Sequence, residues 1–185
     1  MRTYLKDQLE RFLVAVDAAL DEPTEVIVIG GTAAALHYGV KHPTRDIDTW
    51  NTITVSLAEA IKKASQATGL EVPVAKSGIA EGPEGLESRL ERVLPHLKRL
   101  TVRVPEKHDL VLMKTLRADQ HDLDAIAEMH ANSPLELDVL VQRFEDETDP
   151  VGDRRRLRGN FLAVVERLFP GSVESVAKRL EAARG

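Results

Sequence analysis

The sequence contains no cysteine and few aromatic residues, and these absences limit the bonds, metal sites and core that the protein can form. Without cysteine there is no disulfide, no thiolate metal site and no cysteine nucleophile. Aromatic residues make up 4% of the chain, so leucine, valine, isoleucine and alanine must build most of the core. No apolar run approaches the roughly 18 residues that a membrane-spanning helix needs. The N-terminal stretch also lacks an apolar signal core. We therefore expect a cytoplasmic protein with no membrane partner.

The charge balance argues against a generally basic surface for binding nucleic acid. The 185 residues contain 25 lysines and arginines against 30 acids, a formal net charge of -5. A local basic cluster occurs at residues 154–158, but a charge run of this kind is more often a solvated helix face. The length allows one sizeable core, or one domain with a helical extension.

Hydrophobic spacing predicts both helices and strands in the first 105 residues. Apolar residues at helical spacing between Leu5 and Leu20 predict a first helix. The β-branched run at 25–29 predicts a strand buried on both faces, and Gly30-Gly31 predicts a tight turn after it. The further elements predicted here are a helix over 32–38, a strand over 46–55, a helix from a capping box at Ser56 to about residue 68, a strand over 71–75, a loop over 76–85, a short helix over 86–94 and a strand over 100–104.

Everything after Pro105 has helical periodicity. Ser133-Pro134-Leu135-Glu136 predicts a helix that begins with a serine cap and a proline in the first position. Pro170-Gly171 separates the last two helices. The chain is therefore expected to be α+β, with an α+β core over residues 1–105 and a helical region over residues 106–185 packed on it.

The most informative pattern follows the strand predicted at 25–29. Gly30 and Gly31 have no side chains, so a triphosphate can approach their backbone N–H groups and the start of the next helix. Thr32 could add a hydroxyl to this phosphate cradle. No Gly-Lys-Ser/Thr follows the glycines, which excludes a P-loop, and the spacing of a dinucleotide site is also missing.

Two carboxylates follow this cradle along the chain. Asp46 and Asp48 lie two residues apart in a predicted strand, so their side chains point to the same face, while Ile47 points to the other. Carboxylates this close repel each other unless a cation lies between them. Oxygen ligands of this kind suit Mg²⁺ or Mn²⁺, which commonly bind one or two carboxylates together with substrate phosphates. The Gly-Gly turn after a strand and the Asp-X-Asp pair are each common alone, but their combination is much more specific.

The pattern resembles the nucleotidyltransferase superfamily that includes DNA polymerase β. Within it the resemblance is closest to the AbiEii-type toxins of bacterial toxin–antitoxin systems and their relatives. The residues that carry the first resemblance are Gly30-Gly31-Thr32-Ala33, Gly39 and Thr44-Arg45-Asp46-Ile47-Asp48. A second stretch is similar to a helical segment of the toxin branch and comprises Pro105-Glu106, Asp109-Leu110, Lys114, Arg117 and His121-Asp122-Leu123-Asp124-Ala125-Ile126.

The resemblance implies a small mixed sheet of the nucleotidyltransferase fold flanked by helices, with a helical C-terminal part. It implies that the Gly-Gly turn holds a nucleoside triphosphate and that Asp46 and Asp48 hold Mg²⁺. Characterised toxins of this kind transfer a nucleotide, some of them to the acceptor end of tRNA. The implied partners are a nucleoside triphosphate, a tRNA, another RNA or a protein hydroxyl as acceptor, and a cognate antitoxin protein.

Charged residues of the second half are further candidates. Lys114 and Arg117 lie three apart on one predicted helix and share a face, where they could neutralise triphosphate charge in the transition state. Two solvated cations are the alternative. Asp122 could be a first-turn acid of the next helix, a base toward an attacking hydroxyl, or the group that orients Lys114. Asp124 is a weaker candidate than Asp122.

One feature of active superfamily members is missing. Many carry a third carboxylate on a later strand, but the strand at 100–104 presents Thr101 and Arg103 on its polar face. Glu71 and Glu106 are the candidate substitutes, and no spacing argument favours either of them. Two alternatives to an enzyme therefore stay open: a non-catalytic nucleotide-binding protein of the same fold, and an antitoxin or interaction module in which Asp-X-Asp is a chance surface pair.

Overall fold

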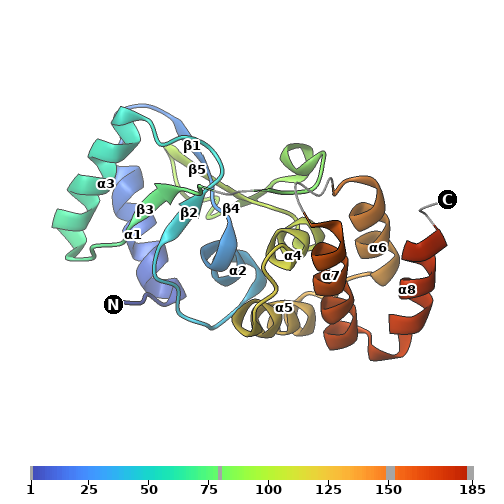
Figure 1. Cartoon of the computed structure of the whole chain (residues 1–185). Helices are drawn as coiled ribbons and strands as arrows, with labels where there is room; N and C mark the ends of the chain where they lie inside the picture. The colour runs from blue at the N-terminus through green and yellow to red at the C-terminus, as the bar shows by residue number, and fades with distance from the viewer. Residues whose placement is uncertain (1, 79–80, 149–152, 183–185) are drawn as a thin grey trace. The chain divides into compact units, whose positions relative to one another are not determined.

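The computed structural model describes residues 2–78, 81–148 and 153–182, and it confirms the α+β class (Figure 1). The chain forms two compact units. The first unit comprises Met1–Ala80 and Arg89–Pro105, and the second comprises Glu81–Ser88 and Glu106–Gly185. Among the described residues, all five strands belong to the first unit, and the second unit is helical. The expected packing of residues 106–185 on the first part stays a prediction.

The sheet of the first unit is mixed, as predicted. Strand β1 (Thr24–Ile27) runs parallel to β5 (Leu100–Val104), and β5 pairs in antiparallel fashion with the edge strand β4 (Glu91–Val93). Strand β2 (Ile47–Thr49) runs parallel to β3 (Val74–Lys76). An antiparallel bridge between Val28 and Thr49 connects the two groups of strands directly after β1.

Three helices complete the first unit. Helix α1 (Lys6–Ala19) buries the apolar face predicted from its spacing and packs against α3 (Val55–Thr68). Helix α2 (Gly30–Tyr38) follows β1 directly and ends at Gly39, whose φ of 69° lies in the left-handed region. This β1–α2–β2 order places the start of α2 beside the strand that carries Asp48.

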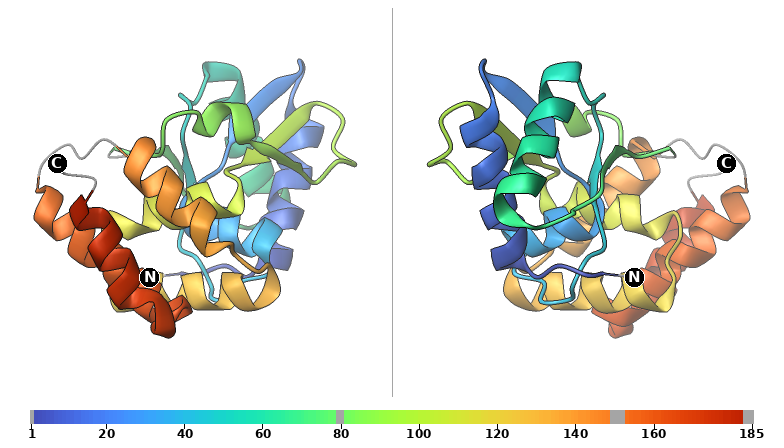
Figure 2. Two further views of the ribbon diagram at one scale, coloured as in Figure 1. Left: turned by 90° about the vertical axis from the view of Figure 1, so that its right-hand side faces the viewer. Right: turned by 90° about the vertical axis from the view of Figure 1, so that its left-hand side faces the viewer.

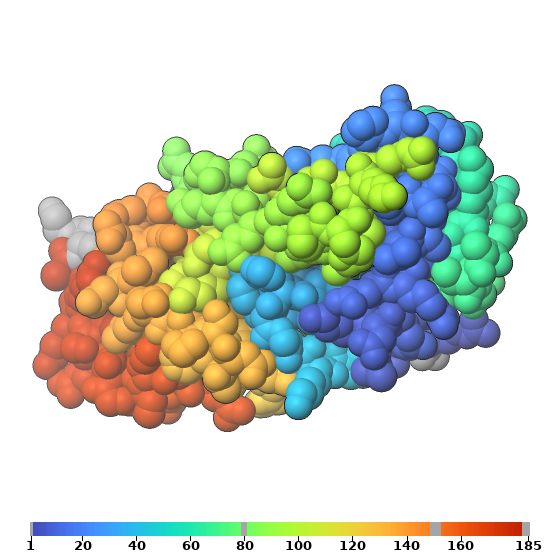
Figure 3. Space-filling model, turned by 180° about the vertical axis from the view of Figure 1, so that it is seen from behind, coloured from blue at the N-terminus to red at the C-terminus, as the bar shows by residue number. Residues whose placement is uncertain are grey.

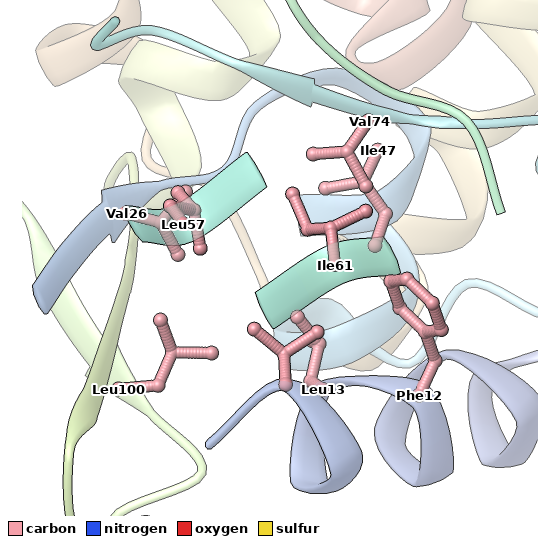
Figure 4. Close-up of a pocket in the computed structure, with 9 residues that line it drawn as sticks. Phe12, Leu13, Val26, Ile47, Leu57, Ile61, Val74 and Leu100 are labelled. Atoms are coloured by element: carbon pink, nitrogen blue, oxygen red, sulfur yellow. The ribbon is translucent and has the colours of Figure 1, made fainter. Parts of the chain in front are cut away.

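A small apolar cavity lies in the core of the first unit (Figure 4). Its lining consists only of apolar side chains from α1, α3 and the strands: Phe12, Leu13, Val16, Val26, Ile47, Leu57, Ile61, Val74 and Leu100. Buried apolar surface next to empty space loses contacts that a larger side chain would make. The cavity is therefore a place where added volume should stabilise the fold.

We expect Val26→Ile to raise the free energy of unfolding by up to about 0.8 kcal/mol, the contribution of one buried methylene. Val26 lines the cavity and is 4% exposed, so the extra methyl group fills existing space. Urea unfolding measures the effect. Val14→Ile on α1 is the matched control, because Val14 is 43% exposed and gains little burial. Destabilisation by Val26→Ile alone would show that the space is too small.

The second unit consists of helices around their own core. These are α4 (Lys107–Thr115), α5 (Gln120–Asn132), α6 (Leu137–Asp146), α7 (Arg154–Leu168), the 3₁₀ turn η2 (Pro170–Ser172) and α8 (Val173–Ala182). Phe144 and Phe161 stack with their ring centroids 3.9 Å apart and join α6 to α7. Within the described residues, no helix is long and apolar enough to cross a membrane.

Two predicted boundaries near the second strand were wrong. The strand expected over 46–55 ends at Thr49, because the chain bends there and Trp50 N donates to the carbonyl of Ile27. The helix expected to begin at a Ser56 cap begins at Val55 and is capped by Thr54, whose hydroxyl accepts from Leu57 N at 3.2 Å. A different hydroxyl in the same short segment therefore satisfies the free N–H groups of the first turn.

Two further predictions failed because of strand pairing and side-chain contacts that the local sequence pattern does not show. The short helix expected over 86–94 is a 3₁₀ turn η1 (Leu86–Arg89) followed by β4, which pairs with β5. Helix α6 begins at Leu137 and not at the predicted Ser133 cap. Leu135 N donates to His130 Nδ1 and Glu136 N donates to His108 Nε2, and these bonds hold the preceding residues outside the helix.

Candidate functional site

The start of α2 presents free backbone donors. The helix begins at Gly30 itself, so the predicted turn at Gly30-Gly31 is instead the first turn of the helix. Gly30 has φ +68°, a conformation that side chains disfavour, and Ile29 at the cap position provides no side-chain hydrogen bond. The first N–H groups of an α-helix have no partner within the helix and attract anions. This part of the predicted phosphate cradle therefore has suitable geometry.

Asp48 lies directly beside this helix start. Its backbone carbonyl accepts from Ile29 N at 3.0 Å, and a Cβ added to Gly30 would lie 3.6 Å from Asp48 Oδ2. The predicted alternation is also present, because Ile47 and Thr49 are buried whereas Asp46 and Asp48 are partly exposed. Asp48 therefore lies on the side of β2 away from Ile47, whereas Asp46 lies directly before the strand, which begins at Ile47 and not at the predicted residue 46.

Two threonine hydroxyls hold the backbone of Asp46. Thr32 Oγ1 donates to the Asp46 carbonyl at 2.6 Å, and Thr44 Oγ1 donates to the same oxygen at 3.3 Å. The single proton of the Thr32 hydroxyl is thus used inside the protein, and not as a phosphate donor as the sequence had suggested. A Cβ on Gly31 would lie 3.2 Å from Thr44 Oγ1, so a larger residue at position 31 would require this threonine to shift by a few tenths of an ångström.

Sequence reasoning missed the anchoring of this segment. Thr44 forms an antiparallel bridge with Tyr4, with N–O distances of 2.7 and 3.0 Å, and the Tyr4 hydroxyl donates to the carbonyl of Glu71 at 2.6 Å. Thr44 belongs to the Thr-Arg-Asp-Ile-Asp pattern, which could have drawn attention to it. Tyr4 has no sequence signal, because its partners lie about 40 and 67 residues away along the chain.

The donor atoms of Asp46 and Asp48 fit a hard divalent cation. They supply carboxylate oxygens, the ligand type that Mg²⁺ prefers, and Mg²⁺ usually takes its other ligands from water and phosphate. In the part of the chain that the structure describes, no three histidine, cysteine, aspartate or glutamate side chains group to hold a metal. Glu71, considered above as a third acid, instead pairs with Arg2 at the surface. Any metal held here would need substrate oxygens to complete its coordination.

The charged residues predicted in the second half meet in one network of the second unit. Lys114 Nζ lies 3.0 Å from Asp122 Oδ1, and Arg117 binds both oxygens of the same carboxylate at 2.7 and 3.0 Å. Lys114 and Asp122 are buried, with exposed fractions of 8% and 1%. Arg117 is not on the helix of Lys114 as predicted, because α4 ends at Thr115, but it still converges on the same acid.

The network determines what Asp122 can do. Burial raises the pKa of this carboxyl, but the Arg117 guanidinium and the Lys114 ammonium lower it more, so the pKa lies below its ordinary value. Such a carboxylate is a weak proton acceptor. Asp122 lies in the first turn of α5, behind the capping residue Asp119, as one of the sequence alternatives proposed. The geometry favours the role of holding Lys114 over that of a general base.

Glu106 also has a structural role in the second unit. It caps α4, contacts His108 Nδ1 at 2.8 Å and forms an ion pair with Arg143, which also binds Asp109 at 2.7 Å. Burial raises the pKa of Glu106, but the hydrogen bonds and charges of His108 and Arg143 lower it to about 2. These partners occupy the side chain that was considered as a possible third acid.

The depressed pKa of Glu106 predicts acid sensitivity. Its ordinary pKa of 4.5 falls to about 2 on folding, so its stabilisation is present above pH 4.5 and is lost as the pH falls toward 2. The difference corresponds to about 3 kcal/mol. At pH 7 we expect the free energy of unfolding of the parent to be higher than that of Glu106→Gln by about this amount. At pH 2 the difference should be small. Urea titrations measure both, and Glu59→Gln, at an exposed position, is the control. A pH-independent difference would contradict the prediction.

Comparison with known proteins supports the superfamily suggested by these motifs. The family model described as "Nucleotidyltransferase of unknown function (DUF6036)" matches residues 7–164, a range that contains the α2 start, Asp46, Asp48 and the Lys114 network. No curated protein and no solved structure matches the chain. The AbiEii-type branch stays a prediction. The match covers most of the sequence, and the chain therefore belongs to this family of nucleotidyltransferases.

Proposed function

We propose that the protein is a Mg²⁺-dependent, toxin-like nucleotidyltransferase that moves a nucleotide from a nucleoside triphosphate to a hydroxyl of an RNA, such as a tRNA, or of a protein. The observation that carries the proposal is the start of α2, which no side chain caps and which lies beside the Asp48 carboxylate. Family membership supports the reaction class. A cognate antitoxin partner is supported by the sequence resemblance alone.

Each residue of the first unit has a specific task in this proposal. The N–H groups of Gly30 and Gly31 bind phosphate oxygens of the triphosphate. Asp46 and Asp48 hold the cation, which supplies charge neutralisation and polarises the reacting phosphate when bound. Thr32 and Thr44 fix the backbone of Asp46. The oxygen of the acceptor hydroxyl then attacks the α-phosphorus, and the bond between this phosphorus and the oxygen that bridges it to the β-phosphate breaks. Pyrophosphate leaves, and the hydroxyl proton passes to solvent.

For the second unit we propose that transfer requires the ammonium of Lys114, assisted by Arg117, with Asp122 holding both cations. The support is the sequence resemblance together with the fixed position of Lys114 on Asp122. Lys114→Met keeps most of the buried apolar stem and removes the charge. A loss of transfer with intact triphosphate binding is the expected result, and unchanged transfer would remove Lys114 from the proposal.

A non-catalytic nucleotide-binding protein is the second candidate. The observation in its favour is that the described residues bring no third acid to Asp46 and Asp48. Such a protein would bind triphosphate and gain stability from it without turnover.

One experiment separates the candidates. The purified chain is incubated with each of the four α-labelled triphosphates, Mg²⁺ and total tRNA, and the same mixtures are followed by thermal unfolding. Labelled RNA or labelled protein supports the transferase. A rise in melting temperature without transfer supports the nucleotide-binding protein. If neither occurs, the proposal is wrong and an antitoxin or interaction module is favoured.

A further inference from the structure

Basic residues concentrate on one hairpin of this acidic protein. The first unit contains 13 lysines and arginines against 11 acids, whereas the second contains 12 against 19. Residues 89–103, which include β4, the connection and all of β5 except Val104, form what we call the basic hairpin. Its only acid is Glu91, and its cations are Arg89, Arg92, Lys98, Arg99 and Arg103. The excess positive charge of the first unit is therefore local.

The basic hairpin is held rigidly. Asp17 Oδ1 on α1 accepts three consecutive backbone N–H groups, from Lys98 at 3.0 Å, Arg99 at 2.7 Å and Leu100 at 2.7 Å. Leu97 and Leu100 are buried beneath the connection. Both views in Figure 2 show the connection projecting from the first unit, and its atoms reach the surface in Figure 3. The cations are therefore presented on a fixed frame, which reduces the entropy lost on binding a partner.

The charges of the hairpin are only partly compensated. Glu91 is engaged by His37 Nε2 at 2.6 Å and by the Tyr38 hydroxyl at 3.2 Å. Arg92 stands directly opposite Arg103 in the β4–β5 pair, an unfavourable arrangement for like charges.

Arg103 itself is paired with Glu25 on β1. Arg92 and Lys98 are exposed and form no ion pair with any residue that the structure describes. Charged residues on an edge strand also discourage pairing with a further strand. That role accounts for Arg92 on β4, but it does not account for Arg103 opposite it on β5.

The hairpin runs alongside the strand that leads to the phosphate cradle. The carbonyl of Arg99 accepts from Thr24 N at 2.8 Å, and the carbonyl of Arg103 accepts from Val28 N at 2.8 Å. These contacts cover both ends of β1, about 13 Å at the rise of a strand. Val28 lies two residues before Gly30 in the chain. A polyanion along the hairpin would therefore extend toward the start of α2.

We propose that the basic hairpin binds the phosphate backbone of a nucleic acid strand. Arginine pairs with phosphate through two parallel hydrogen bonds, and lysine adds a point charge. Residues 89–103 contain no phenylalanine, tyrosine or tryptophan, so bases have no aromatic side chain to stack on and binding depends on the backbone and not on sequence. The exposed large apolar residues in the described part of the chain are Leu5, Val14 and Val55, none of them on the hairpin, which argues against a membrane surface.

The test measures binding of fluorescein-labelled 20-mers of oligouridylate and oligothymidylate by anisotropy at several salt concentrations, without triphosphate or metal. The test variant combines Arg92→Gln, Lys98→Gln and Arg99→Gln. The matched control removes three exposed cations of α1 and α3 with Arg11→Gln, Lys62→Gln and Lys63→Gln. The hairpin variant should bind at least tenfold more weakly at low salt, and the slope of log K against log salt should fall by about 2, whereas the control should match the parent.

Binding of RNA alone, or of RNA and DNA alike, supports the inference if the hairpin variant loses it selectively. Equal losses in the two variants, no nucleic acid binding by the parent, or a selective loss of binding to phosphatidylserine vesicles would overturn it. Arg92→Lys with Arg99→Lys keeps the charges and should keep the salt slope, which guards against a folding defect. The test measures binding and not nucleotide transfer, so its result can be interpreted even if the protein has no nucleotidyltransferase activity.

Discussion

Asp46→Asn and Asp48→Asn are each expected to reduce nucleotide transfer by at least about a hundredfold, the scale of losing a main electrostatic contributor to catalysis. Asparagine keeps the size of the side chain but removes the charge that would hold the cation. The bonds from Thr32 and Thr44 go to the backbone carbonyl of Asp46, so this substitution leaves them in place. The loss should therefore appear in activity and not in folding.

Label transfer from an α-labelled triphosphate to RNA measures this effect, with thermal unfolding recorded in parallel. Asp21→Asn, at an exposed position of the same unit, is the matched control and should transfer as the parent does. The melting temperature of the Asp46 variant should match that of the parent, because the hydrogen bonds to its backbone are kept. Full transfer by both the Asp46 and the Asp48 variant would contradict the assignment of these residues.

Asp122→Asn is expected to lower the free energy of unfolding by about 3–5 kcal/mol, the usual cost of leaving a buried charge without its partner. The Asp122 side chain is 1% exposed and that of Lys114 is 7% exposed, so water cannot replace the lost carboxylate. Arg117, with a side chain that is 68% exposed, can turn to solvent and contributes less to the loss. Urea unfolding at neutral pH measures the effect.

Asp124→Asn is the control for this prediction, because the same residue type in the same helix is paired with Arg167 at the surface. It should cost less than about 1 kcal/mol. The double variant Lys114→Met with Asp122→Leu should recover much of the stability, since it removes both buried charges together. If Asp122→Asn unfolds like the parent, the network does not stabilise the second unit and its role must lie elsewhere.

These two predictions separate two kinds of acid that look alike in the sequence. Asp46 and Asp48 are partly exposed beside an uncapped helix start, a position suited to a ligand. Asp122 is buried and bound by two cations, a position suited to holding another side chain. The Glu106 carboxylate is likewise bound by Arg143 and His108. Burial and partners, which differ between these acids, therefore decide which of them can meet a substrate.

The sequence by itself determined the features that depend on neighbours along the chain. The alternation around Ile47, the helix end at Gly39 and the strand at Leu100–Val104 follow from side-chain period and backbone freedom, which are local properties. Only the tertiary structure decided the pairing of β4 with β5, the hold of Asp17 on the basic hairpin and the contact of Thr44 with Tyr4. Each of these depends on which distant segment is adjacent after folding, and the free energy of that choice is shared across the whole core and is not encoded in any short pattern.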